Sequence, residues 1–160
     1  MQPAWRPMTS ADLPQVEAIG EAVHPAYPED PAVLVERLAL YPRGCHVLAD
    51  PQGLHGYAVS HPWHDLRPPP LNHLLGALPD LPGCAYIHDV ALSGTIRGEG
   101  VGRRIIGCLI AAAGGLPVCL VAVGRSVPFW TRFGFAPAGD DVTDAMLNSY
   151  GASAVYMRRI

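Results

Sequence analysis

The sequence predicts an α/β fold, in which strands of a sheet alternate with helices along the chain. The length of 160 residues suits one domain, taken as residues 1–160. Apolar residues make up 49% of the chain, which provides for a sizeable core and argues against disorder. Apolar residues recur at helical spacing in some segments and gather into strand-like runs in others, and the two kinds of segment alternate.

The first third of the chain predicts a strand, two helices and a hairpin. Thr9 or Ser10 can cap the first helix. Asp30 followed by Pro31 is typical of a helix start, because aspartate caps free N–H groups and proline suits the first helical position. The expected boundaries are a strand at 5–8, helices from 9 or 10 to about 24 and at 31–41, and strands at 45–49 and 54–60 around a turn at 50–53.

Residues 61–83 form the least regular segment and are rich in proline. Apolar residues between the prolines predict a short helix over 71–78. A long irregular segment inside a compact domain is more often functional than idle.

The second half of the chain predicts a strand, a glycine-rich turn and a helix. A strand at 84–92 precedes the turn, and a helix begins near residue 101. Further on we expect a strand at 118–123, a second helix, an acidic patch that includes Asp140, Asp141 and Asp144, and a final strand at 152–159.

The glycine-rich turn has the character of an anion site. Free N–H groups and a partial positive charge mark a helix start, and glycines let an anion approach closely. Three cations also lie where the helix dipole disfavours them, so a bound anion would compensate. The residues concerned are Gly98, Gly100, Gly102, Arg97, Arg103 and Arg104. The alternative is a surface arginine cluster over a turn.

Two common phosphate-binding motifs are disfavoured. A P-loop requires Gly-Lys-Ser/Thr, but Gly102 is followed by Arg103. The dinucleotide fingerprint requires a third glycine at Arg103 and an acidic residue about twenty positions on, where the apolar run 118–123 lies. Nucleoside triphosphatases and nicotinamide enzymes are therefore disfavoured.

Arg97, Gly100 and Gly102 match the pattern Arg/Gln-x-x-Gly-x-Gly/Ala, which resembles the acyl-CoA signature of the Gcn5-related N-acetyltransferase (GNAT) family. Residues 128–135, an aromatic pair followed by Gly-Phe, resemble a later motif of that family, and residues 6–13 resemble its opening. The resemblance implies a mixed, mostly antiparallel sheet of six or seven strands with helices on both faces.

The resemblance also implies an activity. It implies transfer of an acetyl group from acetyl-CoA to a primary amine of a small molecule or peptide, by direct attack in a ternary complex. A non-catalytic acyl-CoA-binding sensor or partner module is the alternative, and the resemblance leaves a homodimer open. The implied cofactor residues are Val90, Ala91, Leu92, Arg97, Gly98, Glu99, Gly100, Val101, Gly102, Arg103, Ser126, Phe129 and Trp130. The implied acceptor residues are Tyr27, Glu29, Trp63, His64 and Tyr86, with ordinary loop packing as the alternative.

Strand 84–92 carries the expected base. Strict alternation would place Tyr86, His88, Val90 and Leu92 on one face and Ile87, Asp89 and Ala91 on the other. Histidine has an ordinary pKa near neutrality, so His88 is the expected proton acceptor, and Asp89 is the second candidate. A core histidine bonded to a carbonyl is the alternative for His88. The resemblance implies that a backbone N–H near Val90 meets the oxyanion.

Trp130 stands where the family usually has a tyrosine that protonates the leaving thiolate. An indole N–H can donate a hydrogen bond but is no general acid. Either the thiolate leaves unaided or another hydroxyl substitutes, the candidates being Tyr150, Ser126 and Tyr86.

Composition disfavours several other classes. A net charge of −3 does not suit nucleic-acid binding. No apolar run reaches the ~20 residues that span a bilayer, and we expect no signal peptide. The four cysteines form no Cys-x-x-Cys pair, which predicts free thiols in a cytoplasmic protein. His61 and His64 have no evident third ligand, so no metal site is expected.

Overall fold

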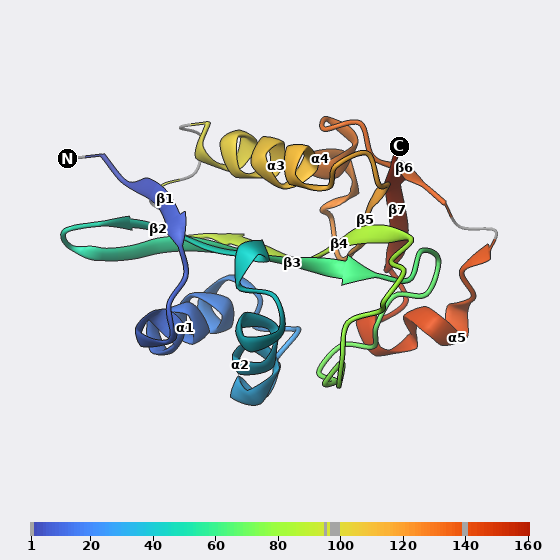
Figure 1. Ribbon diagram of the computed structural model, residues 1–160, viewed down its shortest axis with the longest axis horizontal. Helices are drawn as coiled ribbons and strands as arrows, with labels where there is room; N and C mark the ends of the chain where they lie inside the picture. Colours follow the sequence, from blue (N-terminus) through green and yellow to red (C-terminus); the bar gives the residue numbers. More distant parts are fainter. Residues whose placement is uncertain (1, 95, 97–99, 139–140) are drawn as a thin grey trace.

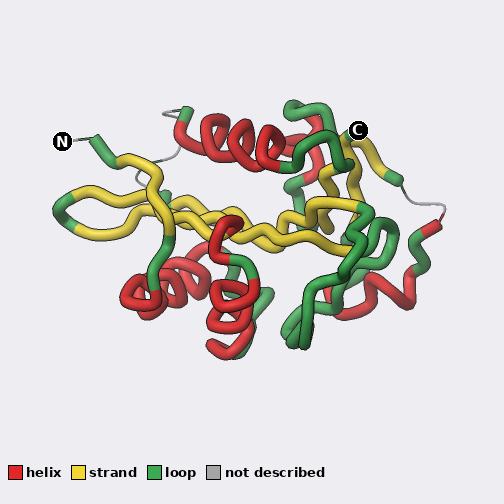
Figure 2. Tube along the Cα trace, in the orientation of Figure 1, coloured by secondary structure: helices red, strands yellow, loops and turns green. Residues whose placement is uncertain are grey.

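The computed structural model describes residues 2–94, 96, 100–138 and 141–160. In this part of the chain a seven-stranded sheet carries helices on both faces (Figures 1 and 2). The strand order is β1-β2-β3-β4-β5-β7-β6, and every neighbouring pair is antiparallel except β4 and β5. The predicted fold class is therefore confirmed.

The strands are β1 Ala4–Pro7, β2 Cys45–Asp50, β3 Gly53–Trp63, β4 Cys84–Leu92, β5 Val118–Ala122, β6 Ala136–Pro137 and β7 Val155–Arg159. The α-helices are α1 Leu13–Val23, α2 Pro31–Leu40, α3 Val101–Ala112, α4 Val127–Thr131 and α5 Asp144–Leu147. Short 3-10 turns lie at η1 Ser10–Asp12, η2 Pro42–Gly44 and η4 Asn148–Tyr150. None of the helices in the described ranges is long and apolar enough to cross a membrane.

A side-chain cap begins α2, and a hydrogen-bonded turn precedes α1. The Asp30 carboxylate accepts the N–H of Ala32 at 2.9 Å, with Pro31 in the first position of α2, as predicted. Before α1, Asp12 accepts the Thr9 N–H at 2.8 Å. Arg6 donates to both Asp12 oxygens at 2.8 Å, and this bond lowers the Asp12 pKa to about 2.

Two cores lie on opposite faces of the sheet. On one face α3 and α4 cover a cluster that includes Ile87, Ile105 and Trp130. On the other face α1 and α2 cover a cluster that includes Val16 and Tyr57. Burying an apolar face of every helix against the sheet is what stabilises this arrangement.

The predicted helix over 71–78 is wrong. Asn72 and Gly76 have positive φ angles of 60° and 77°, which a right-handed helix does not tolerate. The backbone N–H groups of Leu75 and Gly76 instead donate to the Glu36 carboxylate at 2.6 and 3.0 Å. Side chains of neighbouring elements therefore satisfy the backbone that a helix would have satisfied internally. The Asn72 N–H likewise goes to Glu29, at 2.9 Å.

Candidate active site

The sheet opens between β4 and β5. Their last register pair in the described residues is Ile87 with Leu120. β4 continues to Leu92, whereas β5 continues to Ala122 in register with β7 alone. In the described residues beyond Ile87, the backbone groups on the β5 side of β4 therefore have no strand partner, and another group can bind there.

Helix α3 begins beside this opening. Two glycines, Gly100 and Gly102, allow the backbone to turn into the helix and to approach β4. Gly100 has a φ of 74°, a conformation that side-chain-bearing residues rarely adopt, and the space where its Cβ would lie is open. A Cβ on Gly102 would lie 3.3 Å from Leu92 Cδ1, so glycine allows α3 to approach the end of β4. The predicted cofactor residues Arg97, Gly98 and Glu99 lie outside the described residues.

The first turn of α3 is anchored from across the sheet. The Trp5 indole N–H donates to the Val101 carbonyl at 2.9 Å. Val101 also packs with Leu48 and Ile96 in a small buried cluster. The helix start is thereby held against β1 and β2, although Val101 lies 96 residues after Trp5 in the chain.

Helix α4 places its aromatic residues against α3. Trp130 is buried, with its ring 5.1 Å from the Phe129 ring and 5.5 Å from the Phe135 ring, in the core beneath α3. Phe129 packs at the edge of the same core. The exposed Arg103 guanidinium lies 5.9 Å from the centre of the Phe133 ring, a cation–π distance. Ser126 donates its hydroxyl to the Val123 carbonyl at 2.8 Å.

The predicted alternation of β4 is wrong, because the strand contains a β-bulge at His88. Val59 of β3 is opposite Asp89 and Ser60 is opposite Ile87, so His88 is an extra residue in the ladder. After the bulge the faces are exchanged. Val90 joins Ile87 in the core beneath α3, and Leu92 packs beside the start of α3. Asp89 and Ala91 instead lie on the α1–α2 face, together with His88.

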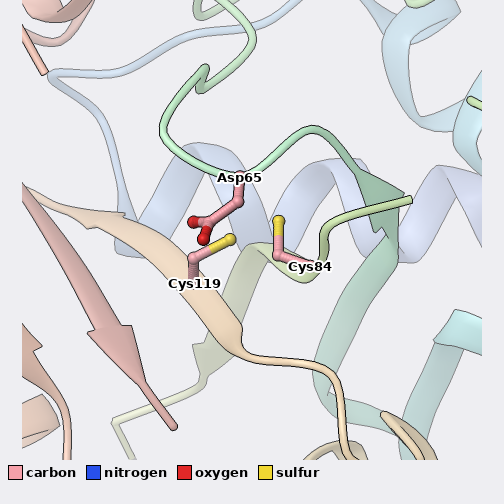
Figure 3. Close-up of side chains that lie close together, drawn as sticks. All are labelled: Asp65, Cys84 and Cys119. Atoms are coloured by element: carbon pink, nitrogen blue, oxygen red, sulfur yellow. The ribbon is translucent and has the colours of Figure 1, made fainter. Parts of the chain in front are cut away.

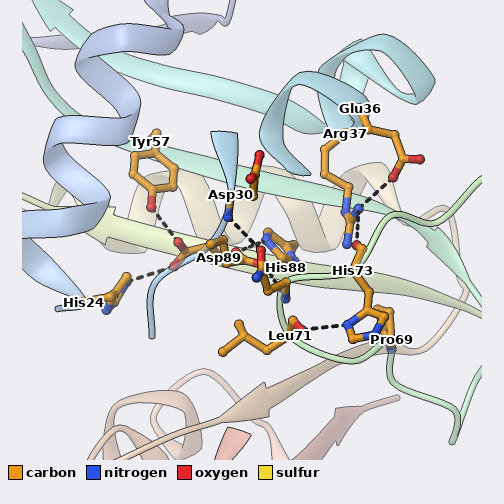
Figure 4. A network of polar contacts seen from close by, with 12 residues as sticks. His24, Asp30, Glu36, Arg37, Tyr57, Pro69, Leu71, His73, His88 and Asp89 are labelled. Atoms are coloured by element: carbon orange, nitrogen blue, oxygen red, sulfur yellow. Dashed lines mark hydrogen bonds and ion pairs between the residues drawn. The ribbon is translucent and has the colours of Figure 1, made fainter. Parts of the chain in front are cut away.

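His88 and Asp89 each form an imidazole–carboxylate pair on that face (Figure 4). His88 Nε2 lies 2.8 Å from Glu29 Oε1, and His24 Nε2 lies 2.9 Å from Asp89 Oδ1. The Tyr57 hydroxyl donates to Asp89 Oδ2 at 2.5 Å. The two pairs are arranged in opposite ways. At His88 the strand supplies the imidazole and Glu29 the carboxylate, whereas at Asp89 the strand supplies the carboxylate and His24 the imidazole.

Both carboxylates are held ionised. Burial alone would raise the pKa of Glu29, but the hydrogen bond and charge of His88, with the Asn72 N–H, outweigh it and lower that pKa. Burial is likewise outweighed at Asp89, whose pKa is lowered by His24, His88 and the Tyr57 hydroxyl. An ionised carboxylate only accepts, so His88 donates its Nε2–H to Glu29 and, when neutral, keeps Nδ1 as its basic nitrogen.

A cavity of about 230 Å³ adjoins these pairs, between α1, α2 and the sheet. Its apolar wall includes Val16, Tyr27, Leu34 and Tyr57. Its polar lining in the described part of the chain is Glu17, Glu21, His24, Glu29, Asp30 and Asp89, with neither lysine nor arginine. His88, whose side chain is 2% exposed, is not part of that lining, so a ligand in the cavity would meet Glu29 and Asp89 first.

The other residues predicted for catalysis or acceptor binding lie in two places: Tyr86 contacts Tyr150, and Trp63 contacts His64. The Tyr86 and Tyr150 hydroxyls lie 3.2 Å apart, and Tyr150 donates to the Pro69 carbonyl at 2.6 Å. Burial raises the Tyr150 pKa to about 12. Trp63 and the exposed His64 contact each other at the far end of β3, where Trp63 pairs with Cys84, four residues before His88. That spacing corresponds to about 13 Å along a strand.

The comparisons with known proteins agree with this fold. The model of the acetyltransferase (GNAT) family matches residues 11–135. The chain belongs to the GNAT family. No curated relative matches it.

Solved structures share the GNAT fold over the whole chain. Ard1 from Thermoplasma volcanium is 15% identical with a TM-score of 0.72, covering 100% of this chain and 98% of its own. A Corynebacterium glutamicum protein described as histone acetyltransferase HPA2 and related acetyltransferase is 26% identical with a TM-score of 0.61, covering 99% and 96%. The GNAT-like decarboxylase GphF, solved with isobutyryl-CoA, is 17% identical with a TM-score of 0.76, covering 98% of each chain.

Sequence reasoning missed His24 and Tyr57 of this candidate site, and it missed Arg37, whose charge acts on Glu29. His24 and Tyr57 hold Asp89, but they come from α1 and β3, and no local pattern joins them to β4. Arg37 is 1% exposed and donates from Nη1 to Glu36 and to the His73 carbonyl, at 2.9 and 3.2 Å. The signal for Arg37 was an arginine between apolar positions of a helix, which also fits a solvated face.

Two of the four cysteines of this GNAT chain meet near Asp65 (Figure 3). The Cys84 and Cys119 sulfurs and an Asp65 oxygen lie within 4.8 Å of one another. Asp65 is already engaged by Arg158 at 2.7 Å and by the Tyr156 hydroxyl at 2.9 Å. The neighbouring Cys119 and burial raise the Cys84 pKa, so the protonated thiol is favoured and the cluster packs as part of the core.

Proposed function

We propose that this protein transfers the acetyl group of acetyl-CoA to a primary amine of a small molecule or peptide. The observation that carries the proposal is the position of β4, which borders the strand opening on one edge and the α1–α2 cavity on one face. A thioester in the opening and an amine in the cavity would meet at the bulge around His88.

The cofactor end rests on the helix start at Val101. Its free N–H groups and the open space at Gly100 suit a pyrophosphate. N-acetylglutamate synthase from Neisseria gonorrhoeae, which shares the fold with a TM-score of 0.74, was solved with coenzyme A and N-acetyl-glutamate. Arg103 beside this start supplies a cation for phosphate oxygens.

The acceptor end provides the proton chemistry. Simple amines have a pKa near ~10 and arrive mostly as ammonium ions, which the carboxylates of Glu29 and Asp89 would bind. We assign the proton acceptor to His88, whose basic nitrogen Nδ1 would take the ammonium proton through a water while Glu29 accepts the Nε2–H and holds the ring. The His24–Asp89 pair is the second candidate. The neutral amine then attacks the thioester, and a backbone N–H near Val90 meets the oxyanion.

The leaving thiolate has no evident acid in the described residues. Trp130 is packed in the core, and the Tyr150 hydroxyl is committed to Pro69 and Tyr86 on the α1–α2 face. A simple thiol has a pKa of about 8.5, so departure as thiolate is tolerable. The presence of Trp130 in place of the family's usual tyrosine also favours the second candidate function, a non-catalytic acyl-CoA-binding module.

One experiment separates the two functions. The purified protein is mixed with acetyl-CoA and a panel of amines, and free thiol is followed with a chromogenic reagent. Amine-dependent thiol release supports the acetyltransferase. Tight CoA binding by calorimetry, without release for any amine, would support the binding module instead.

A further inference from the structure

Asp65, Cys84 and Cys119 bring three metal-binding atoms together at one place in the fold. Figure 3 shows the carboxylate and the two sulfurs turned toward one another, and all three atoms lie within 4.8 Å of one another. A tetrahedral zinc ion with Zn–S bonds of 2.3 Å holds its ligand atoms about 3.8 Å apart, so small side-chain rotations would complete such a site. The three residues are far apart in the sequence, which is why no metal-binding motif revealed them.

Each of the three residues comes from a different segment of the chain. Cys84 begins β4, Cys119 lies in the parallel strand β5, and Asp65 follows the end of β3. Tyr86, two residues after Cys84, is the register partner of Cys119, so both thiols lie on the same face of the sheet. The sheet therefore fixes both sulfurs, and the loop after β3 adds the carboxylate.

The charges around this cluster suit a divalent cation. Two thiolates and one carboxylate carry three negative charges, which Zn²⁺ would reduce to one. Arg158 lies 2.7 Å from Asp65 Oδ2 and balances that remaining charge. The Tyr156 hydroxyl donates to Asp65 Oδ1 at 2.9 Å. Each carboxylate oxygen keeps a second lone pair, so these two bonds orient Asp65 and still leave it able to bind a metal.

The metal-free cluster is neutral at its two sulfurs. The neighbouring Cys119 and burial raise the pKa of Cys84, so the thiols keep their protons. Zinc binding would replace two S–H bonds by two Zn–S bonds and release both protons to the solvent. Both cysteines are fully buried, but the Asp65 side chain is 17% exposed, which gives an ion access from the loop.

We propose that Asp65, Cys84 and Cys119 bind one zinc ion, with a water as the fourth ligand. Thiolates suit both Zn²⁺ and Cu⁺, and the carboxylate favours Zn²⁺ of the two. The ion would join the end of β3 to β4 and β5, the strands between which the sheet opens. This site is independent of the proposed acetyl transfer, because it uses none of the residues assigned to either substrate.

The test uses the full chain, freed of metal with a chelator, kept reduced with a phosphine and titrated with Zn²⁺ in a calorimeter. We expect one ion bound per chain. About two protons should be released, which is measured by repeating the titration in buffers of different ionisation enthalpy. Co²⁺ in place of Zn²⁺ should give sulfur-to-cobalt charge-transfer bands, which require thiolate ligands.

Variants assign the ion to this cluster. Cys84→Ala/Cys119→Ala should lose the charge-transfer bands and at least about 100-fold in zinc affinity, because even the loss of a residue that supports a metal ligand costs 10–100-fold. The matched control Cys45→Ala/Cys108→Ala removes the other two free thiols and should keep both properties. Asp65→Asn keeps both thiols and the side-chain shape, and zinc affinity should fall by at least about tenfold, which tests the site even if the first variant does not fold.

Three results would overturn the proposal. The first is the absence of zinc binding by the wild-type chain, or binding without proton release. The second is zinc binding that is unchanged in Asp65→Asn or in a folded Cys84→Ala/Cys119→Ala variant, which would place the ion elsewhere on the protein. The third is loss of the charge-transfer bands in Cys45→Ala/Cys108→Ala. None of these measurements uses acetyl-CoA or an amine, so their outcome does not depend on the acetyltransferase activity.

Discussion

At the scale of single residues, the β-bulge determines what the proposed active site contains. A regular strand would direct only one of His88 and Asp89 toward the α1–α2 face. The extra residue in β4 directs both there, where they meet Glu29 and His24. One strand therefore supplies two imidazole–carboxylate pairs to a single face.

Replacing His88 tests its assignment as proton acceptor. His88→Gln should lower kcat by roughly 10²-fold or more, because a positioned general base contributes about that factor. In the wild type the rate should rise with pH and then level off, as general-base catalysis requires, and the variant should lack this limb. CoA affinity should change little, since the imidazole lies on the α1–α2 face. The measurement is steady-state kinetics from pH 5 to 9.

His55→Gln is a matched control, because His55 pairs with Asp50 at 2.8 Å at the β2–β3 hairpin, outside the cavity lining. Its kinetics should match those of the wild type. If His24→Gln abolishes the pH limb while His88→Gln keeps it, the base is the His24–Asp89 pair and the assignment to His88 is wrong.

What the sequence could predict at this scale followed from local chemistry. The Asp30–Pro31 helix start was predicted because a cap depends on neighbours in the chain, and the structure confirms it. The faces of β4 were predicted wrongly because a bulge depends on the register with β3. His24 was missed because its partner Asp89 is sixty-five residues away.

At the scale of elements, the turn before α1 depends on one carboxylate. Asp12 accepts the Thr9 N–H and both Arg6 donors. Its folded pKa, about 2, lies below the ordinary value of 3.8. The stabilisation is therefore complete above about pH 4 and is lost as the pH falls toward 2.

Asp12→Asn should lower the free energy of unfolding by about 1 kcal/mol at pH 7, a value kept small because Arg6 is 44% exposed. The difference from wild type should shrink between pH 4 and pH 2. Urea unfolding at several pH values measures both effects. Asp80→Asn, at an exposed loop position, should leave stability nearly unchanged; an equal loss there would show that Asp12 has no special role.

The segment at 71–76 is held by α2 rather than by its own secondary structure. Glu36 accepts the N–H groups of Leu75 and Gly76, and Arg37 donates to the His73 carbonyl. The sequence shows the apolar residues of this segment but not these long-range bonds, which is why a helix was predicted.

Glu36→Ala should release the segment and leave Arg37 buried without its carboxylate. Removing one partner of a buried pair costs about 3 kcal/mol or more, so the free energy of unfolding should fall by that order. Amide hydrogen exchange at Leu75 and Gly76 should accelerate. Glu21→Ala, an exposed change on α1, serves as the control. Unchanged exchange at residues 75 and 76 in the Glu36 variant would contradict the role given to Glu36.

At the scale of the whole molecule, the sheet separates the two proposed substrates. The α1–α2 face carries the acidic cavity, whereas α3 begins at the opening between β4 and β5. The residues that join them are those of β4 after Ile87. The order of elements could be predicted from sequence, because the turn glycines and apolar runs are local signals. The opening could not, because it depends on where the β4–β5 register ends.

Coenzyme A should therefore raise the free energy of unfolding, and the size of this increase should depend on the residue at position 100. A ligand that binds only the folded state at a hundred times its Kd adds about 2.7 kcal/mol to the free energy of unfolding. Gly100→Ala places a methyl group in the open space at the start of α3, so it should reduce that increment. Gly114→Ala is the matched control. Gly114 also has a positive φ, 63° against 74°, and also faces open space, but it lies just after α3 ends.

Without CoA, both variants should lose a similar amount of stability, about 1 kcal/mol, because alanine is strained at positive φ. With CoA, the gain in melting temperature should persist in Gly114→Ala and shrink in Gly100→Ala. Thermal unfolding over a range of CoA concentrations measures both quantities. Equal CoA-dependent shifts in the two variants would place the cofactor away from the α3 start, since the backbone strain is shared and only the site of the added methyl group differs.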